Sequence, residues 1–324
     1  MRWLSKKLRD ERGGTAVMVA ILLVPLIGCL AIAIDVGALY AERAQLQNGA
    51  DAAALAVAND CAIDDRCDDP AGLAQAFANG NANDAAANIA SLLFPTANSV
   101  RVVTSTREAG TGDPAMRHPF AAILGNETST VHAEATAEWG SPESSTTVLP
   151  IAISLCDFRP SLDGSLQLIR YDERRPGATC AGPEGSPIPG GFAWIERIED
   201  ECAGIVDLDT ESLPSDPGID FPGVCADTLA NLEGRTIVVP IFDGATVTHG
   251  SDKAYHYFGF AAFEITGWKF GGGPAVTNLD PAAPSCRGDC RGIQGRFVEW
   301  VSPDAAGVEI GGPDLGVTIV RLSR

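Results

Sequence analysis

The sequence predicts an α+β protein: an N-terminal transmembrane helix that extends into a small α+β unit, followed by a mostly β, disulfide-containing C-terminal domain. Three observations support this fold class. Residues 13–34 contain no charged side chain and are mostly apolar, which is long enough to cross a bilayer. After residue 147, short apolar runs alternate with Gly- and Pro-rich loops, a pattern typical of β domains. Eight of the nine cysteines follow the apolar stretch.

The composition excludes nucleic acid as the main partner. The 324 residues contain 42 Asp and Glu against 23 Lys and Arg, which gives a net charge of −19. Binding to a phosphate backbone needs a basic surface instead. At 45% hydrophobic residues, the chain is also too apolar for a wholly disordered protein.

The N-terminal segment predicts a single-pass membrane anchor. Residues 1–14 form a basic segment, and residues 15–34 form the expected transmembrane helix. Positive charge precedes the apolar stretch, whereas Asp35 and Glu42 follow it. By the positive-inside rule we expect a cytoplasmic N-terminus, a helix surrounded by membrane lipid, and C-terminal domains outside the cytoplasm.

Two other interpretations of this segment stay open. Ala31-Ile32-Ala33 resembles a signal-peptidase site, and Leu26-Ile27-Gly28-Cys29 resembles a lipobox. The apolar sequence continues past Cys29 without a polar tether, which favours a permanent helix. Whether the N-terminus is cleaved or Cys29 is lipidated is left open.

The helix is expected to continue outside the membrane. Between residues 41 and 58 lie eight alanines, and alanine is the best helix former. Four small or apolar residues at 4-3-4 spacing form a narrow face, called the seam here: Leu46, Ala50, Ala53 and Val57. The seam either packs on the chain's own domain or bundles with neighbouring helices, including those of a second copy. The sequence does not choose between these two alternatives, and our functional hypothesis takes the second, in which the seam packs with partner helices.

The same region resembles a known family. The residues that carry the resemblance are Arg9-Asp10-Glu11-Arg12-Gly13-Gly14-Thr15-Ala16-Val17, then Asp35-Val36-Gly37 after the apolar stretch, and then Gln45-Leu46-Gln47-Asn48 followed by Asp51-Ala52-Ala53-Ala54. They are similar to the N-terminus of TadE/TadG-like proteins of the bacterial Tad (Flp) pilus, or tight-adherence, apparatus. Four later segments resemble the C-terminal part of TadG-related pilus assembly proteins: Pro150–Cys156, Ile188–Trp194, Val239–Asp243 and Phe258–Phe263.

The resemblance implies a membrane-anchored, non-enzymatic assembly protein with a pilin-like α+β head. Its partners would be other Tad/Flp pilus or secretion-system proteins. The resemblance implies no catalytic residue and no cofactor. Processed pilins of this kind carry a Glu five residues after the Gly that precedes the cut, where this chain has Met18 or Val19.

The region 35–140 is expected to hold the extended helix and the small α+β domain. Helical patterns cover Pro70–Ala78, Ala85–Leu93 and His118–Leu124, and alternating patterns typical of strands cover Ser99–Ser105 and Thr130–Ala137. The small polar residues 141–147 indicate a linker. The β-rich domain then spans 148–324, with apolar runs at Val148–Leu155, Leu166–Tyr171, Thr236–Phe242, Tyr255–Thr266, Arg296–Val301 and Val317–Leu322.

The exported cysteines indicate a disulfide framework, because they form an even set in an oxidising compartment. We expect sequential neighbours to pair, although spacing is only a guide: Cys61 with Cys67, Cys156 with Cys180, Cys202 with Cys225, and Cys286 with Cys290. The spacing of the last pair is also tolerable for metal ligands, but no second Cys or His pair is nearby in the sequence.

The sequence contains no recognisable catalytic motif, so we expect no enzymatic activity, no cofactor and no metal site. There is no Gly-x-Ser-x-Gly, no His-Glu-x-x-His and no P-loop. Two alternatives are kept. The β-rich domain could be a ligand-binding or adhesive module on a membrane anchor. An extracellular hydrolase would need a cleft that joins His249 or His256 to a Ser and an Asp.

Overall fold

The computed structural model describes residues 12–63, 67–158, 163–171, 179–182, 187–210, 213–214, 221–249, 252–271, 277–302 and 308–323. The chain divides into two compact units. The anchor unit comprises Met1–Asp60, Cys67–Ala137 and Leu322–Arg324. The β unit comprises Cys61–Arg66 and Glu138–Arg321. Overall the fold is α+β, with a long apolar helix first and a mostly β, disulfide-containing unit after it, as the sequence predicts.

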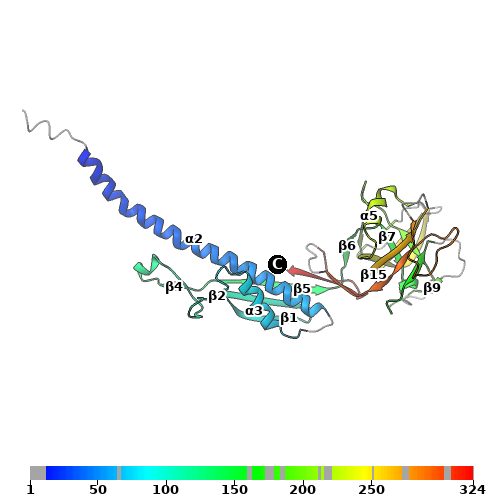
Figure 1. The fold of residues 1–324 in the computed structure, drawn as a ribbon, viewed down its shortest axis with the longest axis horizontal. Helices are drawn as coiled ribbons and strands as arrows, with labels where there is room; N and C mark the ends of the chain where they lie inside the picture. Colours follow the sequence, from blue (N-terminus) through cyan, green and yellow to red (C-terminus); the bar gives the residue numbers. More distant parts are fainter. Residues whose placement is uncertain are drawn as a thin grey trace, which may run out of the picture. The chain divides into compact units, whose positions relative to one another are not determined.

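The first element is one long helix, α2, which covers Arg12–Ala62 without a break (Figure 1). The predicted continuation of the apolar helix beyond residue 34 is therefore confirmed. Pro25 lies inside the helix, where its missing N–H and ring would cost a soluble helix about 3 kcal/mol. A membrane helix tolerates this residue better.

The second helix, α3, covers Pro70–Gly80. Its start follows the sequence signals closely. Asp69 is the N-cap, and its side chain accepts a hydrogen bond of 2.9 Å from the Gly72 N–H. Pro70 occupies the first turn, where a missing N–H costs nothing. The helix buries Ala74 and Ala78.

Three strands of the anchor unit are neighbours in one sheet, in the order β1-β2-β5. They are β1 (Ala87–Thr96), β2 (Ser99–Thr106) and β5 (His132–Gly140), and β1 pairs antiparallel with β2. The strands expected at 99–105 and 130–137 are thus confirmed with small shifts of their ends. Val100 and Val102 of β2 are fully buried, whereas Arg101 between them is exposed. This is the period-2 pattern of a half-buried strand.

The helix expected at Ala85–Leu93 is wrong, because this segment forms strand β1. Ala85 has a positive φ of 55°, which interrupts a right-handed helix. Antiparallel pairing with β2 then fixes the extended backbone. The start of β1 is also bonded to α3, since the Gln75 side chain donates to the Ala87 carbonyl (2.8 Å) and the Ala87 N–H donates to Asn79 Oδ1 (3.1 Å). These long-range contacts outweigh the helix propensity of Ala and Leu.

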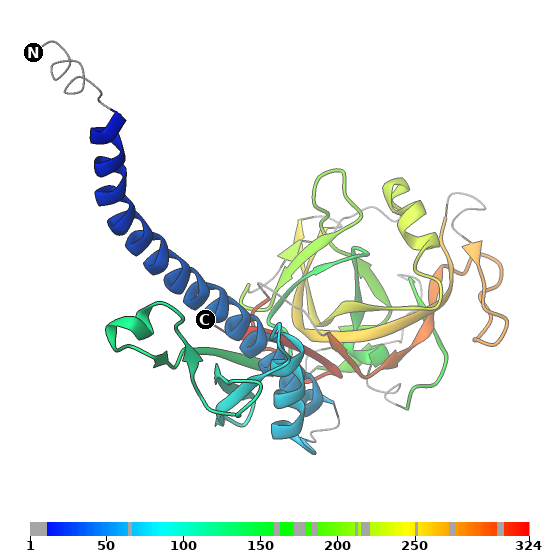
Figure 2. The ribbon, with the colours of Figure 1, turned by 60° about the vertical axis from the view of Figure 1, so that its left-hand side comes forward.

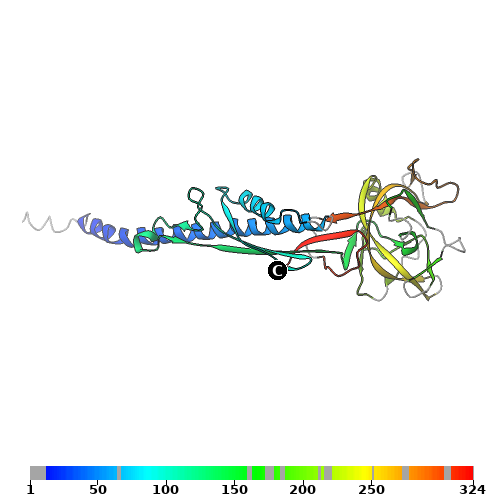
Figure 3. The same ribbon diagram turned by 90° about the horizontal axis from the view of Figure 1, so that it is seen from below.

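Between β2 and β5 the chain makes an excursion over residues 107–131, called the arm here. It contains β3 (Met116–Arg117), the 3-10 helix η1 (Ala121–Leu124) and β4 (Thr128–Ser129). The two short strands pair antiparallel, with Met116 opposite Ser129. The short helix expected at His118–Leu124 is thus a 3-10 helix that begins three residues later. Figures 1 and 3 show the arm running back alongside α2.

The β unit is built on an eight-stranded sheet in the order β11-β7-β14-β15-β17-β8, with β13 and β16 paired to β15. Its two longest strands form an antiparallel hairpin, and Figure 2 shows them strongly curved. The strands of this sheet are β7 (Ile151–Ser154), β8 (Gln167–Arg170), β11 (Phe192–Trp194), β13 (Leu213–Pro214), β14 (Arg235–His249), β15 (Asp252–Lys269), β16 (Thr277–Asn278) and β17 (Gly292–Val298).

The remaining elements of the β unit are short. They are α4 (Leu155–Phe158), η3 (Gly223–Cys225), α5 (Ala226–Ala230), the pair β9 (Thr179–Ala181) and β10 (Pro187–Pro189), the pair β6 (Ser144–Thr147) and β12 (Gly204–Asp207), and the parallel pair β18 (Trp300–Ser302) and β19 (Val317–Ser323).

The structure differs from the expected linker at residues 141–147. Ser144–Thr147 form β6, which pairs antiparallel with β12 from Ser144↔Asp207 to Thr147↔Gly204. The Thr147 side chain is buried and accepts a hydrogen bond from the Gly204 N–H. The small polar side chains predict a loop, but here they occupy a strand because they pair with a second strand about 60 residues further along the chain.

The core of the β unit is rich in aromatic side chains. Trp194 packs against Phe192, Phe221 and Phe270, with ring centroids 5.5–5.9 Å apart. Such contacts add about 0.5–1.5 kcal/mol each beyond the burial of area. Phe192, Trp194 and Phe270 therefore belong to the core of the β unit, and Phe221 packs against it.

Candidate functional site

The N-terminal half of α2 exposes an apolar surface. Val24, Leu26 and Ile21 are 72%, 64% and 67% exposed. Within the described residues, one helix is long and apolar enough to cross a membrane; its most apolar 18-residue window has a mean hydropathy of 3.0 and no buried residue. Soluble proteins rarely leave such a large contiguous apolar surface in water. This half of the helix is therefore a candidate contact surface for lipid.

In the C-terminal half of α2, by contrast, one face is buried. The four residues of the seam are 0–2% exposed: Leu46, Ala50, Ala53 and Val57. Leu46 packs with Ala78 of α3, Ala87 of β1 and Ala133 of β5. The seam therefore packs within the chain, which corrects the hypothesis that these residues bundle with partner helices: a face already covered has no area left for a second helix.

Hydrogen bonds join this half of the helix to the strands. The Thr104 hydroxyl of β2 donates to the Leu46 carbonyl (2.9 Å), and the Gln47 side chain donates to the Glu134 carbonyl of β5 (3.0 Å). The Asn83 N–H donates to Gln45 Oε1 (2.9 Å). Close packing and side-chain hydrogen bonds together make the C-terminal half of α2 a structural element of the anchor unit.

The junction between the two halves lies at Asp35. This residue is only 5% exposed, and its Oδ2 atom accepts a hydrogen bond of 2.6 Å from the Ala121 N–H of η1. His118 of the arm is 7% exposed, and its Nε2 atom lies 2.8 Å from Ser129 Oγ. Between α2 and the arm is a cavity of about 680 Å³, whose lining includes Asp35 and His118.

The sequence did not predict this junction. It places Asp35 at the end of the apolar stretch but gives no partner for it, because Ala121 is 86 residues away along the chain. One signal was present: Asp35 is the first charged residue after the uncharged stretch, and a carboxylate at that place needs either water or a donor.

The β unit carries a disulfide framework. The structure pairs Cys156 with Cys180, Cys202 with Cys225, and Cys286 with Cys290, with Cα–Cα distances of 5.6, 4.9 and 5.3 Å. Cys61 and Cys67 are also disulfide-bonded. Cys29 is the free cysteine of the described residues. These bonds join sequential neighbours, which is the arrangement expected from the sequence.

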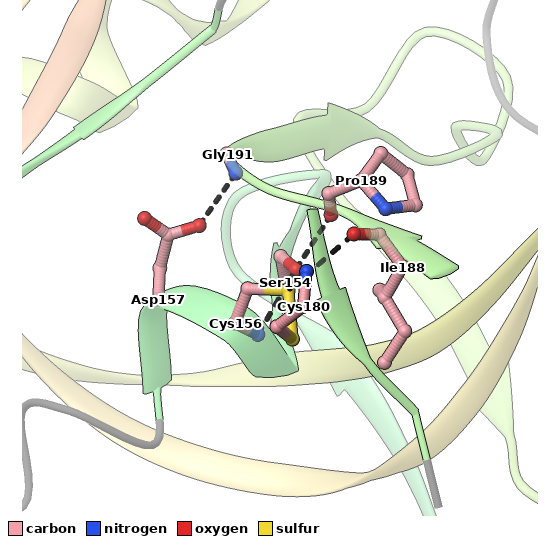
Figure 4. The surroundings of a disulfide bond; sticks show 7 residues. All are labelled: Ser154, Cys156, Asp157, Cys180, Ile188, Pro189 and Gly191. Carbon is pink, nitrogen blue, oxygen red and sulfur yellow. Dashed lines mark hydrogen bonds between the residues drawn. A yellow bond between two sulfur atoms is a disulfide. The ribbon is translucent and has the colours of Figure 1, made fainter. Parts of the chain in front are cut away.

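Hydrogen bonds surround the Cys156–Cys180 bond (Figure 4). The Ser154 hydroxyl donates to the Pro189 carbonyl (2.6 Å) and accepts from the Cys156 N–H (3.1 Å). The Gly191 N–H donates to Asp157 Oδ2 (2.5 Å). Burial raises the pKa of the Asp157 carboxyl, and the hydrogen bond from Gly191 opposes this in part.

Replacement of Asp157 by Asn is expected to stabilise the β unit near neutral pH. Because the pKa of the Asp157 carboxyl is higher in the folded chain than in the unfolded chain, protonation of this carboxyl stabilises the folded state. This stabilisation is complete below the unfolded pKa and is lost as pH rises through the folded pKa. The amide oxygen of the introduced side chain would still accept the Gly191 hydrogen bond without the buried charge. Denaturation midpoints should therefore favour the variant at pH 7 and converge with the wild type below about pH 4. A variant that is less stable at pH 7 would contradict this account.

Of the two histidines considered for catalysis, His256 is not joined to a serine in the described part of the chain. His256 Nδ1 lies 2.5 Å from Asp243 Oδ1 across the β14–β15 hairpin, but no serine hydroxyl of the described residues is hydrogen-bonded to His256. The side chain of His249 lies outside the described residues. Among the described residues, no group of three or more His, Cys, Asp or Glu side chains is arranged to hold a metal ion.

Comparison with known protein families gives one match in the segment that forms α2. Residues 13–60 match the family described as putative Flp pilus-assembly TadE/G-like. The match confirms the resemblance of the N-terminal segment and links the chain to Flp pilus assembly. Neither the curated proteins nor the solved structures give a match to this chain.

Proposed function

We propose that this chain is a non-enzymatic, single-pass membrane component of a Tad/Flp pilus assembly or tight-adherence secretion apparatus. The observation that carries the proposal is the division of α2 into two halves within the segment that matches the family. Residues up to 34 expose an apolar surface, and the residues of the seam, from Leu46 to Val57, are buried in the anchor unit. The helix thus combines a lipid-facing anchor with the central element of a folded head.

The proposed mechanism is mechanical. The apolar half holds the chain in the cell membrane, with the N-terminus in the cytoplasm and both folded units outside. Because the outer half is packed and hydrogen-bonded within the anchor unit, force on that unit passes directly into the membrane helix. Other pilus proteins would then contact the exported surfaces, since the seam is occupied.

Two arginines in the apolar half are expected to weaken membrane insertion. The variant Ile21→Arg with Val24→Arg places two charges at exposed positions of the expected span, at a cost of roughly 3 kcal/mol for each Arg near the bilayer centre. We expect a larger fraction of the protein to be released from membranes by alkaline carbonate. The matched control is Tyr40→Arg with Ala44→Arg, because Tyr40 is 73% exposed and Ala44 is also exposed, but both lie beyond the span.

The control pair should stay in the membrane fraction. Equal release of the two variants, or no release of either, would argue against a membrane-spanning role for residues 15–34.

The pilus part of the proposal needs a second measurement. Affinity capture of the membrane-extracted full chain should recover other proteins of the pilus apparatus, and capture without any of them would remove that assignment while leaving the anchor intact.

A further inference from the structure

The arm brings a second apolar segment to the membrane-facing side of the anchor unit. Residues 119–124 read Pro-Phe-Ala-Ala-Ile-Leu and contain no charge. Ile123 is 82% exposed, which is more than any other large hydrophobic residue in the described part of the chain, and Phe120 is 38% exposed. Arg117 and Glu127 flank this segment, which is called the tip here. Exposed apolar side chains bind the membrane interface in proportion to the apolar area that they bury there.

The position of the tip is fixed by its contact with α2. The Ala121 N–H donates to Asp35, which follows the apolar stretch directly. The first residue of η1 is therefore held at the outer end of the expected transmembrane span. Beyond this contact the tip stays beside the apolar half of α2, because Phe120 and Ile123 line the same cavity as Val24 and Ile27.

The cavity extends along the apolar half of the helix. Val24 precedes Asp35 by 11 residues, which corresponds to about 16 Å along the helix axis. If α2 spans the bilayer, the part of the cavity wall that Val24 forms lies inside the hydrocarbon core, which is about 30 Å thick. The cavity of about 680 Å³ is within the range of about 300–1,000 Å³ that is usual for small-molecule sites.

The outer end of the cavity is polar. Within the described residues, Asp35 Oδ1 and His118 Nδ1 are buried and have no hydrogen-bond partner, and both residues line the cavity. Unpaired buried polar atoms are costly. An occupant with a polar group at this end and an apolar chain along Val24, Ile27 and Ile123 would satisfy both parts of the lining.

We propose that the arm is a second membrane contact, with Phe120 and Ile123 immersed in the outer leaflet and phospholipid filling the cavity between the arm and α2. The acyl chain lies against the apolar walls, and the headgroup lies at Asp35 and His118. This inference rests on the proposed membrane-spanning role of α2. Lipid is chosen over a protein occupant because the cavity walls are continuous with the lipid-exposed surface of the span.

Spin labels on single cysteines test the proposal in the full chain. The protein is reconstituted in vesicles of phosphatidylethanolamine and phosphatidylglycerol. Cys29 is the free cysteine of the described residues, so a label on it reports whether α2 is in lipid. In the Cys29→Ser background, Ile123→Cys reports on the arm, and Ala122→Cys, also exposed, replaces it if the first variant does not fold. Asn98→Cys is the aqueous control, because Asn98 is exposed in the β1–β2 turn, at the opposite end of these strands from the arm.

Collision with oxygen, which concentrates in lipid, is compared with collision with a water-soluble nickel complex. We expect the oxygen-to-nickel ratio at residue 123 to approach that at residue 29 and to exceed that at residue 98 several-fold. A label at 123 that meets nickel as freely as the label at 98, while 29 is protected, would overturn the inference and leave the anchor intact. A label at 123 hidden from both reagents would mean a protein covering and would also overturn it. Nickel access at 29 would refute the membrane-spanning role itself.

Discussion

Replacement of Ala53 by Lys is expected to unfold the anchor unit. Ala53 has no exposed surface, and it lies one turn after Gly49, where an added Cβ would already be 3.4 Å from the Ala78 Cα atom. A Lys side chain has no room there, and its charge would have no partner. We expect the free energy of unfolding to fall by roughly 3 kcal/mol or more. Limited proteolysis and urea denaturation of the full chain in detergent measure this loss.

The matched control is Ala44→Lys on the same helix. Ala44 is exposed, so the same substitution there should leave protease resistance and the urea midpoint nearly unchanged. The pair of variants also distinguishes the two interpretations of the seam. If Ala53→Lys kept a folded anchor unit and lost only its association with other proteins, the seam would be open to partner helices and the intramolecular packing described above would be wrong.

Local patterns in the sequence predicted much of the fold. Three signals are carried by adjacent residues, and each formed the expected element: the apolar stretch, the helical pattern of Pro70–Ala78, and the apolar runs of β14 and β15. The segment at Ala85–Leu93 was predicted wrongly because its Ala and Leu residues favour a helix, whereas its structure depends on pairing with β2. Helix propensity depends on the residue itself, so it does not include the effect of pairing with another strand.

The candidate site shows the same limit. The spacing of Leu46, Ala50, Ala53 and Val57 was sufficient to identify a packing face, but a row of small side chains does not reveal which surface covers it. The covering surface is known only from the structure, in which Ala78, Ala87 and Ala133 pack with Leu46. Likewise, the buried contact of Asp35 with Ala121 joins two segments 86 residues apart, and no local pattern connects them.

Loss of the Cys202–Cys225 bond is expected to destabilise the β unit strongly. The two residues are 23 positions apart, Cys225 is fully buried, and both pack in or against the main core. In the chain-entropy description, a loop of this length corresponds to about 3.4 kcal/mol of stabilisation through restriction of the unfolded chain. The variant Cys202→Ala with Cys225→Ala keeps small apolar side chains at both places, so the measured change in denaturation midpoint should come mainly from the lost cross-link.

The matched control removes the short bond between Cys286 and Cys290, which are 4 positions apart. The same relation gives about 2 kcal/mol for it. Thiol titration of the wild type in denaturant, without reductant, should find one reactive group, Cys29, because the other eight cysteines are bonded. If the short-loop variant lost as much stability as the long-loop variant, loop closure could not be the main effect. Strain or packing around Cys286, which is 2% exposed, would then dominate.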